Sequence, residues 1–218
     1  MSSPDGPDRP GGESDRGRHN RLQPYLLEAI GLVYRPLLDR RRRRLLGTLQ
    51  GEVLEIGPGT GPNLPYYTKD VRWTGVEPNV RMHGWLEGKA SRLGLRFRVV
   101  ESAAERLPAA DSSVDAVVST LVLCTVRDPP GAVSEAMRVL RPGGRFICIE
   151  HVAAPERSWL GWTQRRIRPL WRALADGCEP DRRTWEVLES AGFSGLEIER
   201  FWLPLPLVCP HLAAICTR

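Results

Sequence analysis

Residues 53–61, with the sequence VLEIGPGTG, constrain the fold of this chain more than any other segment. The opening VLEI predicts a short buried strand. Gly57, Gly59 and Gly61 at alternate positions predict a sharp turn, because no Cβ hinders the backbone there. In doubly wound α/β proteins, a glycine turn after the first parallel strand binds nucleotide-like cofactors at the carboxyl edge of the sheet. The segment therefore predicts an α/β fold with such a cofactor at this turn.

An acidic residue, Glu55, stands two positions before the first glycine of this turn. Dinucleotide sites use G-x-G-x-x-G and hold pyrophosphate at a helix N-terminus, whereas an acid at this place would repel phosphate and attract a cation. The pattern E-x-G-x-G-x-G resembles the first motif of class I S-adenosylmethionine-dependent methyltransferases, whose cofactor carries an ammonium, a sulfonium and no phosphate. A tight strand-to-helix turn without a ligand is the alternative.

A second motif follows about twenty residues later in the chain. Residues 71–76, VRWTGV, predict a second strand, and Glu77 comes directly after it. A carboxylate at this strand end can accept hydrogen bonds from both ribose hydroxyls of a cofactor. The other reading is an exposed acid in a turn before Pro78. Two motifs at this separation favour the cofactor site.

The chain divides into three parts. Residues 1–21 contain almost no apolar side chain and are predicted to be disordered, because they cannot bury enough surface to offset the entropy of ordering. Residues 22–50 have apolar residues at helical spacing interrupted by Pro36, which predicts two helices or one kinked helix as an N-terminal cap. Residues 51–218 are predicted to form one methyltransferase domain, with a substrate-binding insertion at about 152–192.

Alternating helices and strands in residues 51–218 predict an α/β, doubly wound, seven-stranded Rossmann-like fold with a mostly parallel sheet and an antiparallel last strand. The sequence RPGG at 141–144 is predicted to end a helix before the fifth strand. Segment 158–175 has tryptophans interleaved with arginines, which predicts an amphipathic helix or helix pair, and we expect most of these tryptophans to pack in the core. The remaining predicted elements are helices 79–93, 130–140 and 182–191 and strands 95–100, 116–118, 145–150, 196–203 and 211–217.

Composition excludes several other classes of protein. Five cysteines without C-x-x-C spacing argue against a disulfide framework and against a zinc site, so no metal is expected. The net charge of +5 lies largely in the run Arg40–Arg44, so no nucleic-acid partner is expected. That run predicts either a solvated helix face or a weak peripheral membrane contact. Without a long apolar run or a signal-peptide pattern, we expect a cytoplasmic protein, either monomer or homodimer.

More selective strings point to one family within the methyltransferases. VLEIGPGTG, STLVLCTV, RVLRPGG, IEHVAAP, LADGCEPDRRTWEVLE and the final PH and LAAIC, in order over residues 53–216, resemble the methyltransferase-like alkyl-thiol S-methyltransferases. Two of them, VLEIGPGTG and RVLRPGG, are shared with quinone-type C-methyltransferases and phospholipid N-methyltransferases. The animal members begin with an apolar membrane anchor, where this chain has a polar segment.

This resemblance implies S-adenosylmethionine as the cofactor and a small thiol as the methyl acceptor. A quinone- or phenol-type C- or O-methyltransferase is the alternative, and a non-catalytic cofactor-binding or RNA-associated module is a third reading. The adenine edge would lie on the A-E-x-L-P turn, where Ala103 replaces an aspartate found in many relatives. The predicted cofactor residues are Glu55, Gly57, Gly59, Gly61, Asn63, Glu77, Pro78, Ala104, Glu105, Thr120 and Leu121.

Methyl transfer to a thiol demands little acid–base machinery, because the enzyme mainly positions the nucleophile and the activated methyl group. His151, directly after the fifth strand, is the best-placed residue to accept the thiol proton, and Asp176 is predicted to orient it. The alternative for His151 is a hydrogen bond to a loop carbonyl. Cys178 is predicted to line the pocket, to form a mixed disulfide with substrate, or to pack in the core. The predicted substrate residues are Tyr25, Cys124, Trp171 and Cys178.

Overall fold

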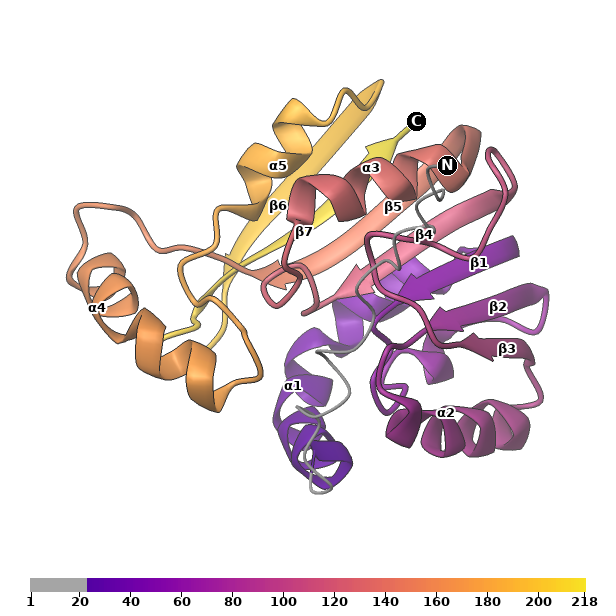
Figure 1. The fold of residues 1–218 in the computed structure, drawn as a ribbon, viewed down its shortest axis with the longest axis horizontal. Coiled ribbons are helices and arrows are strands. Elements are labelled where there is room, and N and C mark those ends of the chain that lie inside the picture. Colours follow the sequence, from indigo (N-terminus) through magenta and orange to yellow (C-terminus); the bar gives the residue numbers. More distant parts are fainter. Residues whose placement is uncertain (1–22) are drawn as a thin grey trace, which may run out of the picture.

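The computed structural model describes residues 23–218, so the predicted disordered leader at 1–21 lies outside the described residues. Seven strands form one sheet in the order β3-β2-β1-β4-β5-β7-β6 (Figure 1). Strands β1 to β5 pair in parallel, and β7 runs antiparallel to both β5 and β6. The predicted seven-stranded fold with an antiparallel last strand is confirmed.

Helices and strands alternate through most of the chain, as predicted. The second strand has the predicted bounds, and Asn79 caps the helix after it through its side-chain oxygen, which accepts from the Arg81 amide. The elements are α1 Gln23–Leu46, β1 Gly51–Ile56, the 3-10 helix η1 Leu64–Tyr66, β2 Val71–Val76, α2 Val80–Leu93, β3 Arg96–Val100, β4 Val114–Thr120, α3 Pro129–Val139, β5 Leu140–His151, α4 Trp159–Leu174, α5 Thr184–Ser190, β6 Gly195–Trp202 and β7 Pro210–Thr217.

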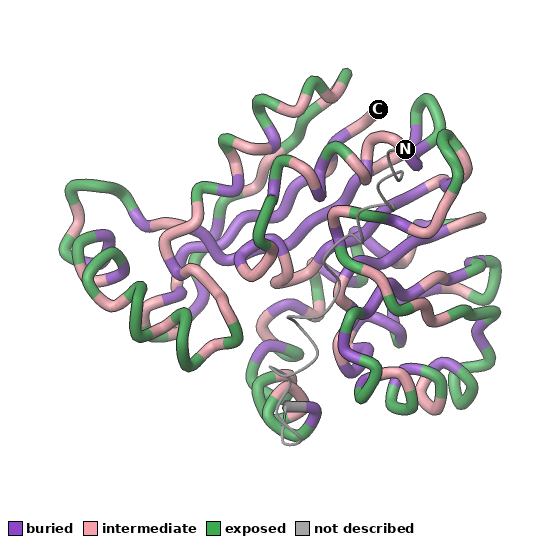
Figure 2. Tube along the Cα trace, viewed as in Figure 1, coloured by how far each residue is buried: buried purple, intermediate pink, exposed green. Residues whose placement is uncertain are grey.

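Two hydrophobic cores cover the two faces of the sheet, because successive strand residues point to opposite sides. Val53 of β1 joins a core with α1, η1 and α2. Its neighbour Leu54 joins the other core with α3 and α5. Figure 2 shows the buried residues running along the central strands, with exposed residues on the outer helices. The carboxyl edge of the sheet is thus the place where the loops of both layers meet.

The N-terminal segment forms one helix, α1, which continues through Pro36. It packs on the sheet through Leu38, Leu45 and Leu46, all of them buried. Its arginine run is largely held by the protein itself: Arg41 and Arg44 pair with Glu199, and Arg43 pairs with Asp39. Arg41 and Arg44 therefore attach α1 to β6.

Arg42, within the same run, is only 2% exposed, and burial lowers its pKa. Its guanidinium lies close enough to Glu55 for attraction between the two charges. The peripheral membrane contact predicted from the arginine run stays a prediction. Within residues 23–218, the helices are all too short or too polar to span a bilayer.

The RPGG segment corrects a predicted boundary. The preceding helix, α3, ends at Val139 as the prediction requires, but β5 begins at Leu140, so the segment lies inside this strand. The pairing of β5 with β4 is irregular there, between Val114 and Ala116. Gly143 takes φ 77° there, and its amide donates to the Arg218 carbonyl at 3.0 Å. The C-terminal residue thereby closes the irregularity, an interaction that local sequence patterns do not reveal.

Helix α4 corrects a second prediction. It is one helix that passes through Pro169, and it lies beyond the carboxyl ends of β4 and β5 (Figure 1). Trp159 is 77% exposed and Trp162 is 61% exposed. The prediction that most of these tryptophans pack in the core is therefore wrong for these two. The periodicity indicated an amphipathic helix correctly, but α4 stands off the sheet and turns much of its apolar surface outward. By contrast, α5 packs on α3 and buries Leu188, so α5 belongs to the helical layer of the fold rather than to an insertion.

Candidate active site

The glycine turn after β1 has the backbone geometry that its sequence predicts. Gly57, Gly59 and Gly61 have φ values of 57°, 57° and 75°, in the left-handed region that favours glycine. A Cβ on Gly57 would lie 2.8 Å from the Val122 side chain, and one on Gly61 would lie 2.5 Å from Leu64. At these two positions, packing inside the protein requires glycine.

Gly59 differs from the other two glycines. Its Cβ position is 3.5 Å from Leu27 Cδ1 of α1, which is ordinary van der Waals contact. The need for glycine here is therefore not explained by crowding inside the protein. The left-handed φ favours glycine here, and a larger side chain would extend toward Leu27 of α1.

Glu77, at the carboxyl end of β2, holds the glycine turn in place. One carboxylate oxygen accepts the Gly59 amide at 2.9 Å, and the other accepts the Asn79 amide at 2.9 Å. The His83 ring donates from Nε2 to the Glu77 carbonyl at 2.9 Å. The Glu77 carboxylate therefore lies against the glycine turn, at the carboxyl end of β2.

Glu55 lies beneath the turn and is enclosed by the protein. Its carboxylate accepts hydrogen bonds from Asn63 Nδ2 at 2.9 Å, Tyr67 OH at 2.8 Å and Trp73 Nε1 at 2.9 Å. Burial raises its pKa, and the residue is 1% exposed. The structure corrects the prediction of a cation-attracting acid: Glu55 shapes the turn from below, acting through Asn63.

Asn63 and the end of β4 meet at the same edge of the sheet. Asn63 Nδ2 also donates to Thr120 Oγ1 at 2.9 Å. Its Oδ1 is buried and lacks a partner among the described residues. Leu121 follows with φ 58°, a left-handed conformation that is uncommon outside glycine and that often marks functional sites. A buried acceptor without a partner, beside open backbone at Gly59, fits a ligand that brings its own hydrogen-bond donor.

The remaining predicted cofactor residues border this edge. Pro78 is exposed, directly before the capping Asn79. Ala104 is buried in the core next to α3, and Glu105 accepts the Asp128 amide at 3.2 Å. Glu105 therefore ties the turn after β3 to the start of α3. Its side chain is engaged within the protein, which leaves its predicted role as a cofactor contact a prediction.

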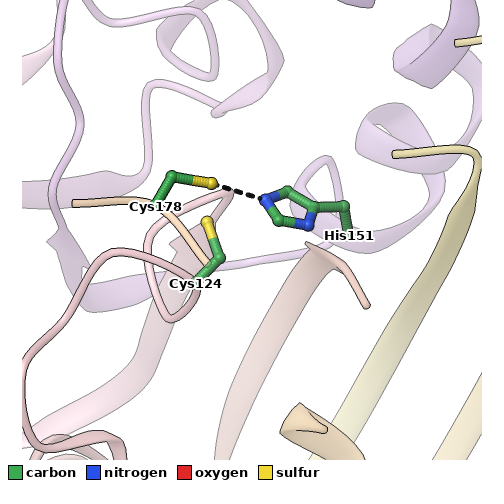
Figure 3. A group of neighbouring side chains, drawn as sticks. All are labelled: Cys124, His151 and Cys178. Atoms are coloured by element: carbon green, nitrogen blue, oxygen red, sulfur yellow. Dashed lines mark hydrogen bonds between the residues drawn. The ribbon is translucent and has the colours of Figure 1, made fainter. Parts of the chain in front are cut away.

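Three side chains with metal-binding or nucleophilic chemistry meet at the carboxyl edge. Cys124, His151 and Cys178 place a sulfur or ring-nitrogen atom each so that all three lie within 4.8 Å of one another (Figure 3). His151 Nε2 is 3.0 Å from Cys178 Sγ, and Trp171 Nε1 donates to the same sulfur at 3.4 Å. The Cys124, His151 and Cys178 side chains are called the thiol–imidazole cluster below.

Hydrogen bonds between distant segments assemble this cluster. Cys124 lies in the loop after β4, and Glu150 Oε1 anchors that loop by accepting the Val122 and Leu123 amides, each at 3.1 Å. The Glu179 amide donates to the Cys124 carbonyl at 2.9 Å, which brings the 176–178 turn onto the loop. Because Val122 of the same loop packs against Gly57, the cluster and the glycine turn share one supporting segment.

The two clustered thiols differ in their ionisation. Hydrogen bonds from Cys124 and His151 lower the pKa of the partly exposed Cys178. The same contact with Cys178, together with burial, raises the pKa of Cys124. Cys178 is thus the more acidic thiol of the pair, and the His151 ring lies beside it.

The predicted partner of His151 is not the one observed. Its Nε2 faces Cys178 rather than an open pocket, and its Nδ1 is buried without a partner among the described residues. Neither ring nitrogen bonds to Asp176, which takes φ 51° in the turn before Cys178. Asp176 therefore does not orient the ring as predicted. The position of His151 at the sheet edge is as expected, but its partner differs.

Sequence reasoning missed two aromatic neighbours of the cluster. His211 of β7 is paired in register with His151, and the two rings are 6.3 Å apart. Burial lowers the pKa of His211 to about 4, so this ring is neutral at pH 7. Tyr34 of α1 packs 5.8 Å from His211. In the sequence, the only signal for His211 was the PH pair at the start of the last strand. Its position beside His151 becomes clear only once β7 is known to pair with β5.

The predicted substrate residue Tyr25 lies elsewhere. It is 64% exposed, and its ring packs edge-on against Trp85 of α2 at 5.6 Å. Tyr34, further along the same helix, is the α1 tyrosine near the cluster. The structure thus brings Cys124, Trp171 and Cys178 together, and it separates Tyr25 from them.

Two cavities lie at different ends of the sheet. One, of about 560 Å³, is at the amino ends of the first strands, lined by residues such as Glu52, Arg72 and Arg96, and is remote from the cluster. The other, of about 460 Å³, lies under α4 and reaches His211. Its wall includes Phe201, and it adjoins the cluster through the pair of histidine rings. Of these two cavities, the second is the one that borders a neighbour of the cluster, His211.

Comparisons with known proteins agree with this geometry. A model described as "Methyltransferase domain" matches residues 54–148. The human protein named thiol S-methyltransferase TMT1A is 38% identical over 202 residues, which cover 87% of this chain and 83% of that protein. Human thiol S-methyltransferase TMT1B is 36% identical over 205 residues with the same coverage. The crystal structure of the YcgJ protein from Bacillus subtilis has a similar fold, with a TM-score of 0.69 at 17% identity, covering 83% of this chain and 97% of that one.

Proposed function

The chain belongs to the thiol S-methyltransferase family, and we propose that it transfers the methyl group of S-adenosylmethionine to the sulfur of a small thiol. The observation that carries the proposal is the thiol–imidazole cluster, which stands on the same loop that packs against the glycine turn. A methyl donor on one side of this loop and an acceptor sulfur on the other would meet at the carboxyl edge.

The residues of the glycine turn fit S-adenosylmethionine. Gly59 has no side chain where the cofactor would lie, and the Glu77 carboxylate stands at the turn, at the strand end where an acid accepts ribose hydroxyls. Asn63 Oδ1 is a buried acceptor that suits an ammonium group. When bound, the cofactor supplies an electrophilic methyl group on a sulfonium. The protein contributes mainly alignment, since in-line displacement at such a methyl group requires little further activation.

The acceptor sulfur must reach this edge as a thiolate. A free thiol with a pKa near ~8.5 is already ionised to a few per cent at neutral pH. The cluster places a sulfur and an imidazole at this edge, with the Trp171 ring nitrogen donating to Cys178. His151 Nε2 is already in contact with Cys178 Sγ. We therefore propose that His151 acts together with Cys124 and Cys178, and not as a separate general base.

The cavity under α4 supports a second candidate function, which is methylation of an aromatic acceptor. Its wall includes Trp185, Phe201 and Trp202, which would suit a flat aromatic acceptor such as a phenol or quinone. Phenols have pKa values near 10, so a far smaller fraction is ionised at neutral pH than for a thiol. The acceptor, not the cofactor, separates the two functions.

A panel of acceptors decides between them. We expect kcat/KM for 2-mercaptoethanol to exceed that for a polyphenol, because a thiolate is the intrinsically stronger nucleophile. Release of S-adenosylhomocysteine is the measured quantity. Ethylene glycol, which has a hydroxyl in place of the thiol, is the matched control and should give no release above background. Faster turnover of the polyphenol than of the thiol would assign the enzyme to the second candidate.

A further inference from the structure

We propose that Cys124, His151 and Cys178 form an open zinc site, and that the acceptor thiol binds the ion as its fourth ligand. The identity of the fourth ligand rests on the proposed function. The binding of the ion by the protein does not, because it depends only on the three side chains in Figure 3.

The arrangement of the three ligand atoms is the first argument. They lie within 4.8 Å of one another, and no change of fold is needed to close them on one ion. With Zn–S near 2.3 Å and Zn–N near 2.0–2.1 Å, tetrahedral ligand atoms lie roughly 3.5–3.8 Å apart. The distance of 3.0 Å between His151 Nε2 and Cys178 Sγ is that of a hydrogen bond, so an ion would replace the proton between them and widen this contact by about half an ångström.

The chemical nature of the ligands is the second argument. Two sulfurs and one imidazole form a soft donor set that selects zinc over magnesium or calcium, which prefer oxygen ligands. Two thiolates balance the charge of Zn²⁺ within a largely buried site. A set of two cysteines and one histidine with one open position is also an arrangement that catalytic zinc sites use, whereas structural sites fill all four positions.

The support around the ligands is the third argument. Cys124 is 2% exposed and His151 is 4% exposed, so the protein fixes both. Glu150 anchors the loop that carries Cys124 by accepting two of its amides. Cys178 is partly exposed, and it lies on a turn held to that loop by the hydrogen bond between Glu179 and Cys124. The protein therefore encloses Cys124 and His151 almost completely and Cys178 less so, which leaves the side of Cys178 for the open position.

The reaction then balances without any oxidant or reductant. The thiol R–SH binds zinc as R–S⁻ and releases its proton to solvent, because a coordinating thiol is deprotonated. The bound sulfur attacks the methyl carbon of S-adenosylmethionine. A new S–C bond forms, the bond between the methyl carbon and the sulfonium breaks, and that electron pair stays on S-adenosylhomocysteine. The thioether product is neutral, so it binds zinc weakly and leaves.

The sequence alone argued against zinc because its cysteines lack C-x-x-C spacing. The three ligands come instead from the loop after β4, the end of β5 and the turn after α4. Short spacing is typical of ligands on one loop or hairpin. Ligands carried by separate elements at a sheet edge leave no such pattern.

The test is metal content of the full chain, purified without chelator, incubated with zinc chloride and separated from free metal. We expect one zinc per chain, and a loss of zinc affinity of about 100-fold or more in Cys178→Ser. Cys209→Ser is the matched control, since Cys209 is also partly exposed but lies outside the cluster. Circular dichroism of each variant checks its fold. Lack of zinc in the parent protein, or equal retention by Cys178→Ser, would overturn the site whatever the other variants do.

Cobalt identifies the fourth ligand separately. Co²⁺ loaded in place of zinc should show thiolate-to-cobalt absorption in the near ultraviolet, and 2-mercaptoethanol should increase it while ethylene glycol should not. An unchanged spectrum on addition of the thiol would overturn the acceptor as fourth ligand. Thiol methylation by a zinc-free enzyme would sink the zinc inference and leave the proposed function intact. Zinc binding by a chain that methylates no thiol would overturn the proposed function and leave the zinc site intact.

Discussion

Replacing Gly59 by valine should abolish detectable binding of S-adenosylmethionine, with a loss of at least about 100-fold in affinity. The residue has φ 57°, which a β-branched side chain adopts only under strain. Its Cβ would meet Leu27 of α1 at 3.5 Å, so the two methyl groups of valine would extend between the glycine turn and α1. We place the cofactor in this position, which is called the cofactor gap. Titration calorimetry measures the affinity directly.

The control for this variant is Gly192→Val. Gly192 has φ 82°, with no atom within 4 Å of its Cβ position, so the substitution imposes backbone strain without filling the cofactor gap. Its melting temperature should fall, and its affinity for S-adenosylmethionine should stay that of the parent. Parental affinity in Gly59→Val would show that the cofactor does not lie against this turn.

Replacing Glu77 by alanine should have an effect of similar size. The substitution removes the acceptor for the ribose hydroxyls, and it also leaves the Gly59 and Asn79 amides without their partner. An unpaired buried amide costs about 1–3 kcal/mol, so the turn itself loses its anchor. We expect S-adenosylmethionine affinity to fall by ~100-fold or more, measured by the same calorimetry.

Two comparison variants sharpen this result. Glu77→Gln keeps one acceptor oxygen, so it can satisfy only one of the two amides and should bind with intermediate affinity. Glu189→Ala removes an exposed acid from α5, on the other face of the sheet, and should bind as the parent does. If Glu77→Ala and Glu189→Ala bound the cofactor equally well, the assignment of the ribose site to β2 would be wrong.

The cofactor half of the molecule was predictable because its signals are local. The glycine turn, the strand at 71–76 and the acid that follows it all lie within thirty residues, and the geometry of each depends on neighbours in the chain. A left-handed φ at Gly57 is written in the residue type itself. For such features, sequence and structure carry nearly the same information.

The acceptor half was less predictable because it depends on contacts between distant segments. The sequence singled out His151, Cys124, Trp171 and Cys178 but could not give their mutual geometry. Their meeting depends on the hydrogen bond between Glu179 and the Cys124 carbonyl. His211 enters only because β7 inserts beside β5, a pairing that no local pattern specifies.

The helices show what periodicity can and cannot indicate. The spacing of apolar residues predicted α1 and α4 as helices, and both are helices. It did not say which surface each would meet, so Trp159 was expected in the core and is 77% exposed. Tyr25 was likewise placed near the substrate, while Tyr34 on the same helix is the residue that faces His211. The spacing of apolar residues identifies the apolar face of a helix, but only the tertiary fold determines which surface that face packs against.

The most direct test of the account is the position of the transferred methyl group. The full chain is incubated with S-adenosylmethionine that carries a trideuterated methyl group and with 2-mercaptoethanol, and the products are analysed by mass spectrometry. We expect one trideuteromethyl thioether for each S-adenosylhomocysteine formed, with the label on sulfur. Labelled product with the methyl group on oxygen or carbon, or no turnover of any thiol by a chain that binds the cofactor, would contradict it.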